Sequence, residues 1–154
     1  MNQDSTPLIG AAAVHLGDGL REDLLHHDPL LDCLVEMTRI HGRPSTRAAL
    51  TAGLPMPKAG LTPSLFARAA SRAGFSSKVV RRSLDRIDAT LLPVILLLDG
   101  NQACVLLSWE AGGAKAHLLF PETGQGGVTL DREELAGRYV GIAIFARPHF
   151  RFDQ

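Results

Sequence analysis

The sequence predicts an α+β fold, in which helices come first and an antiparallel sheet with one late helix follows. Two observations support this prediction. Up to Gly74, apolar residues recur at helical spacing. After Gly74, short apolar runs alternate with glycine-rich turns, as in strands joined by hairpins. The chain has 154 residues and is 45% hydrophobic, which is ordinary for one domain with one core.

The first helix is expected to begin after Asp28, a good N-cap, with Pro29 at the first helical position, where its missing N–H costs nothing. Gly42 is expected to end it. Its apolar residues fall on one face at a spacing of about 3.6 residues. They are Leu30, Cys33, Leu34, Met37 and either Ile40 or His41.

Two more helices are expected before Gly74. A short one covers residues 45–53, and a loop with two prolines covers 54–60. The next helix is capped by Thr62 and continues through Pro63 to Gly74. Its buried stripe is predicted to contain Leu65, Phe66, Ala69 and Ala73.

The second half of the chain is expected to form the sheet. Turns are predicted at 99–102 and 111–113, and one helical turn at 83–87. A capped helix is predicted over 131–139. The strands are expected at 75–83, 92–99, 103–110, 115–120, 126–130 and 141–148.

The domain is expected to span residues 23–150, between a loosely ordered tail (1–22) and the start of a linker (151–154) to a transmembrane domain outside this chain. No signal peptide is expected, and the apolar run 91–98 is too short to cross a bilayer as a helix. Sixteen basic residues balance sixteen acidic ones, which disfavours nucleic acid or an anionic membrane as partner. The arginines of residues 81–86 are interpreted as a solvated face.

The two cysteines are candidates for nucleophilic chemistry, but their positions favour core packing. Cys33 shares the apolar face of its helix, and Cys104 lies within an apolar strand. A nucleophilic cysteine favours the first turn of a helix, where the helix dipole lowers its pKa. In this helix Pro29 occupies that place.

No metal or cofactor site is predicted. His26, His27 and Asp28 are adjacent, but no second cluster has ligand spacing. The other histidines, His41, His117 and His149, have no partner at a defined spacing. The glycine-rich residues 124–127 lack the Lys-Ser/Thr of a phosphate loop and are interpreted as a turn.

An ordered series of segments carries a resemblance to a known family. The series is Cys33-Leu34 with Gly42, then LTPSLFARAASRAGF (61–75), the hairpin around residues 99–102, PETG (121–124) and DREEL with YVGIAIF (131–145). It resembles the N-terminal peptidase-like domain of bacterial ATP-binding-cassette (ABC) exporters, over residues 24–148. In the processing exporters this domain is a papain-like cysteine peptidase that cuts double-glycine leaders.

The resemblance implies that the catalytic residues are absent. It places the catalytic cysteine at Pro29, the histidine at Ala103 (or at Gln102, if shifted by one) and the aspartate at Phe120. The region 22–25, expected to hold the oxyanion-hole glutamine, contains none. Proline lacks a thiol and an N–H, alanine cannot act as a base, and phenylalanine cannot orient a histidine.

The resemblance is strongest to type I secretion transporters, in the LapB-like branch that exports large repeat-containing (RTX) adhesins. Haemolysin exporters carry a related degenerate domain. This implies a soluble domain on the cytosolic side of the bacterial inner membrane that binds unfolded RTX substrate, in a groove around Pro29, Ala103 and Phe120 or at a nearby edge strand. The full-length transporter would be an ATPase.

Three alternatives stay open. The domain could contact the transporter's own nucleotide-binding domain, or it could contact regulatory or assembly partners. It could also be an active thiol hydrolase that uses Cys33 or Cys104. The last reading is weakened because His41 follows Cys33 by eight residues on one helix, about 12 Å along its axis.

Overall fold

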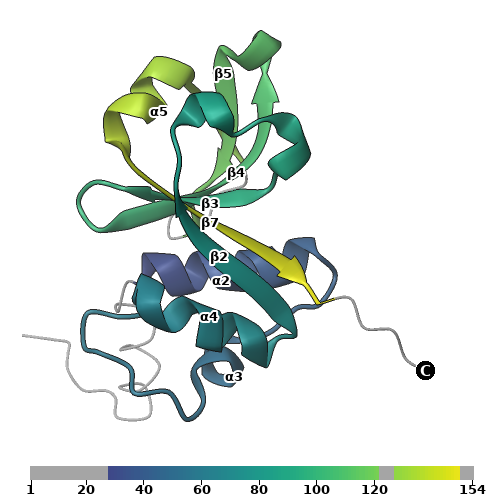
Figure 1. The fold of residues 1–154 in the computed structure, drawn as a ribbon, viewed down its shortest axis with the longest axis vertical. Helices are drawn as coiled ribbons and strands as arrows, with labels where there is room; N and C mark the ends of the chain where they lie inside the picture. Colours follow the sequence, from purple (N-terminus) through teal and green to yellow (C-terminus); the bar gives the residue numbers. More distant parts are fainter. Residues whose placement is uncertain (1–27, 122–126, 150–154) are drawn as a thin grey trace, which may run out of the picture.

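A computed structural model describes residues 28–121 and 127–149 (Figure 1). Four α-helices lie in these residues: α2 (Pro29–Ile40), α3 (Arg47–Thr51), α4 (Pro63–Arg72) and α5 (Arg132–Arg138). The strands are β2 (Phe75–Arg81), β3 (Val94–Leu98), β4 (Gln102–Glu110), β5 (Lys115–Leu119), β6 (Val128–Asp131) and β7 (Tyr139–Pro148). Short 3₁₀ turns are η1 (Leu84–Arg86), η2 (Ala89–Leu91) and η3 (Ala111–Gly113). The predicted tail 1–22 and linker 151–154 lie outside the described residues.

The six strands form one sheet in the order β2-β7-β3-β4-β5-β6, and every neighbouring pair is antiparallel. Consecutive strands pair from β3 to β6. The exception is β7, the last strand, which lies between β2 and β3. The predicted α+β class, with N-terminal helices packed on an antiparallel sheet, is therefore confirmed.

The two faces of the sheet carry separate hydrophobic clusters. On one face α2 packs on β4 and α4 on β2, around Leu34, Met37 and Phe66. On the other face η1 and α5 cover Leu96, Leu106 and Leu118 (Figure 1). Strand alternation explains the division, because successive side chains point to opposite faces. On β4, Ala103 belongs to the first cluster and Cys104 to the second.

Helix α2 forms as the sequence predicts. The Asp28 side chain accepts from the Leu31 amide, Pro29 occupies the first turn, and Gly42 follows with φ of +77°, a conformation that glycine adopts without strain. Its predicted apolar face is buried from Leu30 to Met37. The last predicted member, Ile40, is 38% exposed, and His41 packs edge-on against Phe75 instead.

Several local predictions differ from the structure; for example, the strand predicted at 75–83 ends at Arg81, and the one predicted at 141–148 begins at Tyr139. Asp131 occupies the N-cap of α5 without a capping hydrogen bond, because its carboxylate accepts from Lys115 Nζ at 2.8 Å. The strand predicted from Leu92 begins only at Val94, after the unpredicted turn η2, where Asp88 accepts from the Thr90 amide. In α4, Ala70 is buried, while Leu65 and Ala73 are only partly buried.

Candidate functional site

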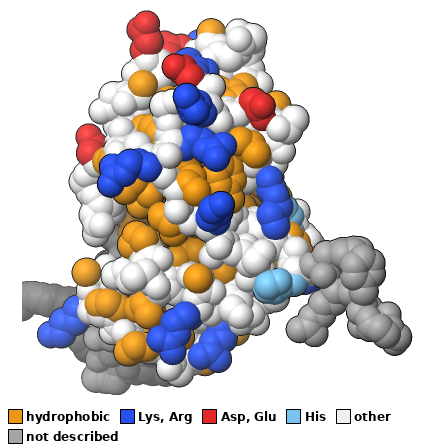
Figure 2. Space-filling model, in the orientation of Figure 1, with side chains coloured by type: hydrophobic (Ala, Val, Ile, Leu, Met, Phe, Trp, Pro, Cys, Tyr) orange, Lys and Arg blue, Asp and Glu red, His pale blue; other side chains and the backbone are white. Residues whose placement is uncertain are grey.

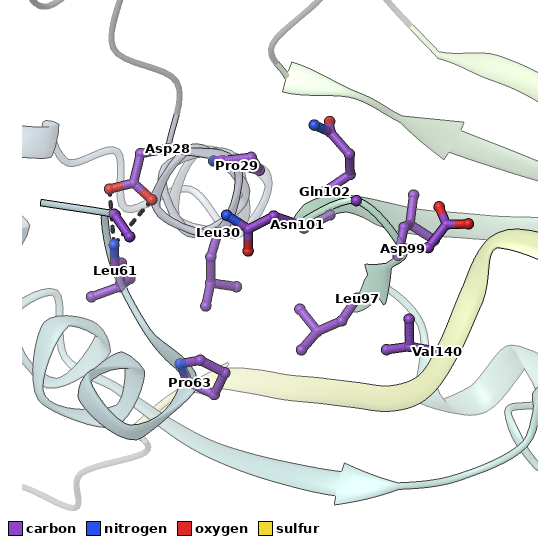
Figure 3. A pocket seen from close by; sticks show the side chains of 14 residues that line it. Asp28, Pro29, Leu30, Leu61, Pro63, Leu97, Asp99, Asn101, Gln102 and Val140 are labelled. Atoms are coloured by element: carbon purple, nitrogen blue, oxygen red, sulfur yellow. Dashed lines mark hydrogen bonds between the residues drawn. The ribbon is translucent and has the colours of Figure 1, made fainter. Parts of the chain in front are cut away.

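A cavity of about 310 Å³ lies between the start of α2, the loop before α4 and the turn that joins β3 to β4 (Figure 3). Its lining is mainly apolar, and the side chains of Leu30, Leu97 and Val140 point into it in Figure 3. A volume near 300 Å³ is at the lower end for small-molecule sites, about the size of a few side chains. The lining residues are Asp28, Pro29, Leu30, Ala59, Leu61, Pro63, Leu97, Leu98, Asp99, Gly100, Asn101, Gln102, Ala103 and Val140.

Asp28 connects two walls of this cavity. Its carboxylate accepts from the Leu31 amide at 3.3 Å, and from the Leu61 amide at 3.1 and 3.0 Å through its two oxygens. The side chain is almost fully buried, at 4% exposure. Buried carboxylates are stable only when hydrogen-bonded, so these backbone donors explain how an acidic residue is tolerated here.

Gly60 makes the close approach of this loop possible. Its φ is +105°, and a Cβ at this position would fall 2.8 Å from the Asp28 carboxylate. The loop can therefore lie against the start of α2 only if residue 60 has no side chain.

The opposite wall is the predicted turn after β3. Gly100 and Asn101 have φ of +67° and +60°, a conformation that glycine, and to a lesser degree asparagine, tolerates. The Asp99 amide donates to the Arg138 carbonyl at 2.8 Å, which fixes the turn beside the start of β7. This contact accounts for the position of Val140 at the edge of the cavity.

The structure brings together two of the three predicted site positions. Pro29 and Ala103 line the same cavity, and Gln102, the alternative to Ala103, lines it too, with its side chain directed away from the centre in Figure 3. Phe120 does not line it. It packs in the cluster on the other face of the sheet, with the Arg138 guanidinium 5.5 Å from its ring centre. The predicted groove around all three residues therefore lacks Phe120.

Both cysteines are buried, on opposite faces of the sheet. Cys33 and Cys104 have no exposed surface and belong to the first and second clusters respectively. Burial raises the pKa of the Cys104 thiol to about 12, although Arg138 acts in the opposite direction. A thiol of this kind is protonated at neutral pH and is a poor nucleophile.

The described residues contain no group of three or more His, Cys, Asp or Glu side chains that could hold a metal ion. His26 and His27, and residues 124–126 of the glycine-rich segment, lie outside them. No helix within the described ranges is long and apolar enough to cross a membrane.

Sequence reasoning missed the loop wall of the cavity and Val140. The bond from the Leu61 amide to Asp28 joins residues 33 positions apart. The pattern Leu61-Thr62-Pro63 indicated only a helix start. Val140 precedes the strand predicted at 141–148, whereas β7 already begins at Tyr139. Gly60 was the one available signal, since a glycine directly before a capping segment often marks a close backbone approach.

The fold and sequence agree with known proteins over most of the chain. A family model described as the peptidase C39 family matches residues 24–151. The N-terminal peptidase C39 like domain of the toxin secretion ATP-binding protein from Vibrio parahaemolyticus is 35% identical, with a TM-score of 0.75. That match covers 80% of this chain and 98% of the Vibrio chain.

More distant structures share the fold. The peptidase domain of Streptococcus ComA, a bi-functional ABC transporter of a quorum-sensing pathway, is 20% identical, with a TM-score of 0.69, over 79% of this chain and 92% of its own. A double glycine motif protease from an AMS/PCAT transporter, solved in complex with the leader peptide, is 18% identical, with a TM-score of 0.67. That match covers 79% of this chain and 85% of the protease chain. No curated protein matches the chain.

Proposed function

Because the chain belongs to the peptidase C39 family, we propose that it is a peptidase-like domain of a type I secretion ABC transporter that binds the exported protein without cutting it. The proposed position is the cytosolic side of the inner membrane, next to the transporter's membrane and nucleotide-binding domains. The proposed cargo is an unfolded RTX-type adhesin.

The observation that carries the proposal is the composition of the cavity at the start of α2. Among the described residues that line it, none has a thiol, a hydroxyl or an imidazole. Pro29 occupies the first helical position, where a nucleophile would benefit from the helix dipole, and Ala103 lies on the facing strand. Neither side chain can attack a carbonyl or transfer a proton.

The rival thiol hydrolase is disfavoured by the same structure. Its two thiols are fully buried on opposite faces of the sheet, and neither lines the cavity. A nucleophilic cysteine needs solvent access and a stabilised thiolate, whereas burial disfavours the thiolate of Cys104.

A binding role is supported by what remains at the site. The cavity is lined mainly by apolar side chains, and one of its walls is held in place by the Asp28 carboxylate. Such a cavity can accept side chains of an extended segment. The relatives point to the same context. One belongs to a toxin secretion ATP-binding protein, and another was solved with a leader peptide.

An NMR titration tests the proposal. Isotope-labelled domain is titrated with an unfolded C-terminal fragment of an RTX adhesin, kept free of calcium. We expect resonance shifts that cluster on one surface. An unrelated unfolded chain of equal length and charge is the control, and it should cause no clustered shifts.

Two further readouts separate the alternatives. A double-glycine peptide incubated with the domain should stay intact, whereas an active family member cleaves it. If the adhesin fragment causes no shifts but the transporter's isolated nucleotide-binding domain does, the docking proposal fails and the inter-domain contact replaces it.

A further inference from the structure

Within the described residues, 28–121 and 127–149, one edge of strand β2 has no partner strand and is called the open edge here. Strand β2 is the end strand of the sheet and pairs only with β7 among the described strands. Its register with β7 runs without a shift from Phe75↔Pro148 to Arg81↔Ile142. An end strand with regular pairing presents a row of free amides and carbonyls, to which another extended chain can add.

The hydrogen bonds at the two ends of the β2–β7 pairing show which backbone groups of β2 face the open edge. The His149 amide donates to the Gly74 carbonyl at 2.7 Å, and the Arg82 amide donates to the Gly141 carbonyl at 3.0 Å. In antiparallel pairs, hydrogen-bonded positions alternate, so even-numbered residues of β2 direct their backbone groups at β7. The backbone groups of Ser77, Val79 and Arg81 therefore face the open edge.

The side chains at this edge are basic, with one apolar residue among them. Lys78 and Arg81 are exposed, and Arg86 follows on η1; none of these three has an ion pair among the described residues. Val79 between them is 44% exposed. Figure 2 shows Lys and Arg side chains gathered on the face of the molecule that carries β2, with hydrophobic surface between them.

Asp85 and Asp88, the acidic residues that follow β2 in the sequence, have other hydrogen-bond partners. Asp85 accepts from Arg132 at 2.7 Å, and Asp88 accepts from the Thr90 amide and hydroxyl. Arg82 lies over the Phe145 ring, 5.4 Å from its centre. Lys78, Arg81 and Arg86 thus carry positive charge with no ion pair among the described residues, although the whole chain has no net charge.

We propose that the open edge of β2 is a docking site for an extended acidic segment of another protein, which adds to the sheet as a further strand. Backbone hydrogen bonds to Ser77, Val79 and Arg81 hold the segment. Lys78 and Arg81 select acidic side chains, and Val79 receives an apolar one.

Charge decides which partner fits. A second copy of this chain at the same edge would bring a second set of the same basic side chains, Lys78 and Arg81, close to the first, and like charges close together across a strand pair are destabilising. An acidic segment reverses the sign of these contacts. The proposal rests on the proposed function and deepens it, since it names the surface and the chemistry of the segment that docks.

The test uses the labelled domain and a short unstructured peptide of Asp-Asp-Val repeats, which carries Asp on both faces when it is extended, as Lys78 and Arg81 on opposite faces of β2 require. We expect the amides of Ser77, Val79 and Arg81 to shift and to become protected from hydrogen exchange. A peptide with Lys in place of Asp should not bind. Binding should weaken as salt is raised, because exposed charges are screened.

Variants of β2 separate the contribution of side-chain charge from that of the backbone hydrogen bonds. The double change K78E/R81E should weaken binding about tenfold or more, because like charges then face each other. Lys115→Glu, on β5 away from β2, is the charge control for Lys78→Glu alone: both change the charge by the same amount, and only Lys78→Glu should weaken binding. Val79→Pro removes one outward amide and should abolish binding, whereas Val79→Thr keeps that amide and should bind.

The outcomes distinguish this proposal from the proposed function. If the adhesin fragment shifts resonances only around Pro29 and Ala103, docking stands and the β2 site is overturned. If the acidic peptide binds β2 but the fragment binds nowhere, the β2 site stands and the proposed function fails. Unchanged affinity in K78E/R81E, or binding to anionic phospholipid vesicles without peptide binding, overturns the β2 site whatever happens to Val79→Pro.

Discussion

Asp28 shows how much a single buried carboxylate can organise. It begins α2 through the Leu31 amide and holds the loop before α4 through the Leu61 amide. The position of one wall of the cavity relative to the other therefore depends on this side chain. Gly60 is its necessary complement, because the loop reaches Asp28 only without a Cβ at residue 60.

Gly60→Ala tests this contact. We expect a loss of about 2–4 kcal/mol in the free energy of unfolding, from a strained positive φ and from displacement of the Asp28 carboxylate. Gly113→Ala is the matched control, with a similar φ of +97° and only ordinary contact at 3.7 Å. Urea unfolding measures both; equal losses would mean that crowding against Asp28 contributes nothing.

Because of the environment of His41, we expect the stability of the fold to decrease at acidic pH. The His41 ring packs on Phe75 and its Nε2 is buried without a hydrogen-bond partner among the described residues. Burial, and secondarily the charge of Arg147, lower its pKa from 6.5. As pH falls below about 6.5, the unfolded chain takes up a proton that the folded protein does not, so stability decreases down to the folded pKa.

The measurement is the free energy of unfolding between about pH 5 and about pH 7.5, in steps of about half a pH unit. This range brackets the ordinary pKa of histidine. His41→Gln should flatten the decrease, whereas His149→Gln, at an exposed position, should leave it unchanged. An identical slope in His41→Gln would show that another group causes the decrease.

At the scale of the element, the start of α2 combines a helix N-terminus with access to the cavity. Pro29 is only partly buried and lines the cavity, while Cys33, one turn later, has no exposed surface. One turn of the same helix thus separates a position that borders the cavity from a position inside the core, where a thiol would be inert.

Pro29→Cys exploits that difference. The introduced thiol should react with iodoacetamide at least about a hundredfold faster than Cys33 and Cys104, which should react only on unfolding. Mass spectrometry of the native protein identifies the modified residue. Pro29→Ser is the control for changes in folding. Fast labelling of Cys33 or Cys104 in the parent would revive the thiol hydrolase.

For the whole molecule, one sheet joins two hydrophobic clusters. The first contains Leu34 and the second is contacted by Trp109, whose indole N–H donates to the Ile87 carbonyl at 2.6 Å. Strand β4 contributes to both clusters. Loss of packing on one face should therefore weaken the other, and the domain should unfold as a unit.

Leu34→Ala tests this coupling. We expect a loss of about 2–5 kcal/mol, typical of a fully buried leucine. Trp109 fluorescence reports the second cluster, and far-ultraviolet circular dichroism reports the helices. Both should shift together, as they should in Leu106→Ala on the other face. A shift in circular dichroism without one in fluorescence would mean that the two faces unfold separately.

Elements whose cause is local can be predicted from the amino-acid sequence alone. Asp28-Pro29 and Thr62-Pro63 start helices through their own side chains, Gly42 ends one through its φ, and Gly100 with Asn101 makes the turn of a hairpin. Apolar periodicity then placed Cys33 and Cys104 in the core. These features depend on residues a few positions apart, so a pattern can show them.

Features that depend on distant partners follow from the folded chain and not from local patterns. The chain's last strand enters between β2 and β3, the Leu61 amide finds Asp28, and the Asp131 carboxylate pairs with Lys115 instead of capping α5. Phe120 joins the cluster opposite the cavity rather than Pro29 and Ala103. Each depends on which groups meet when the sheet closes, and alternation along a strand cannot specify its neighbour.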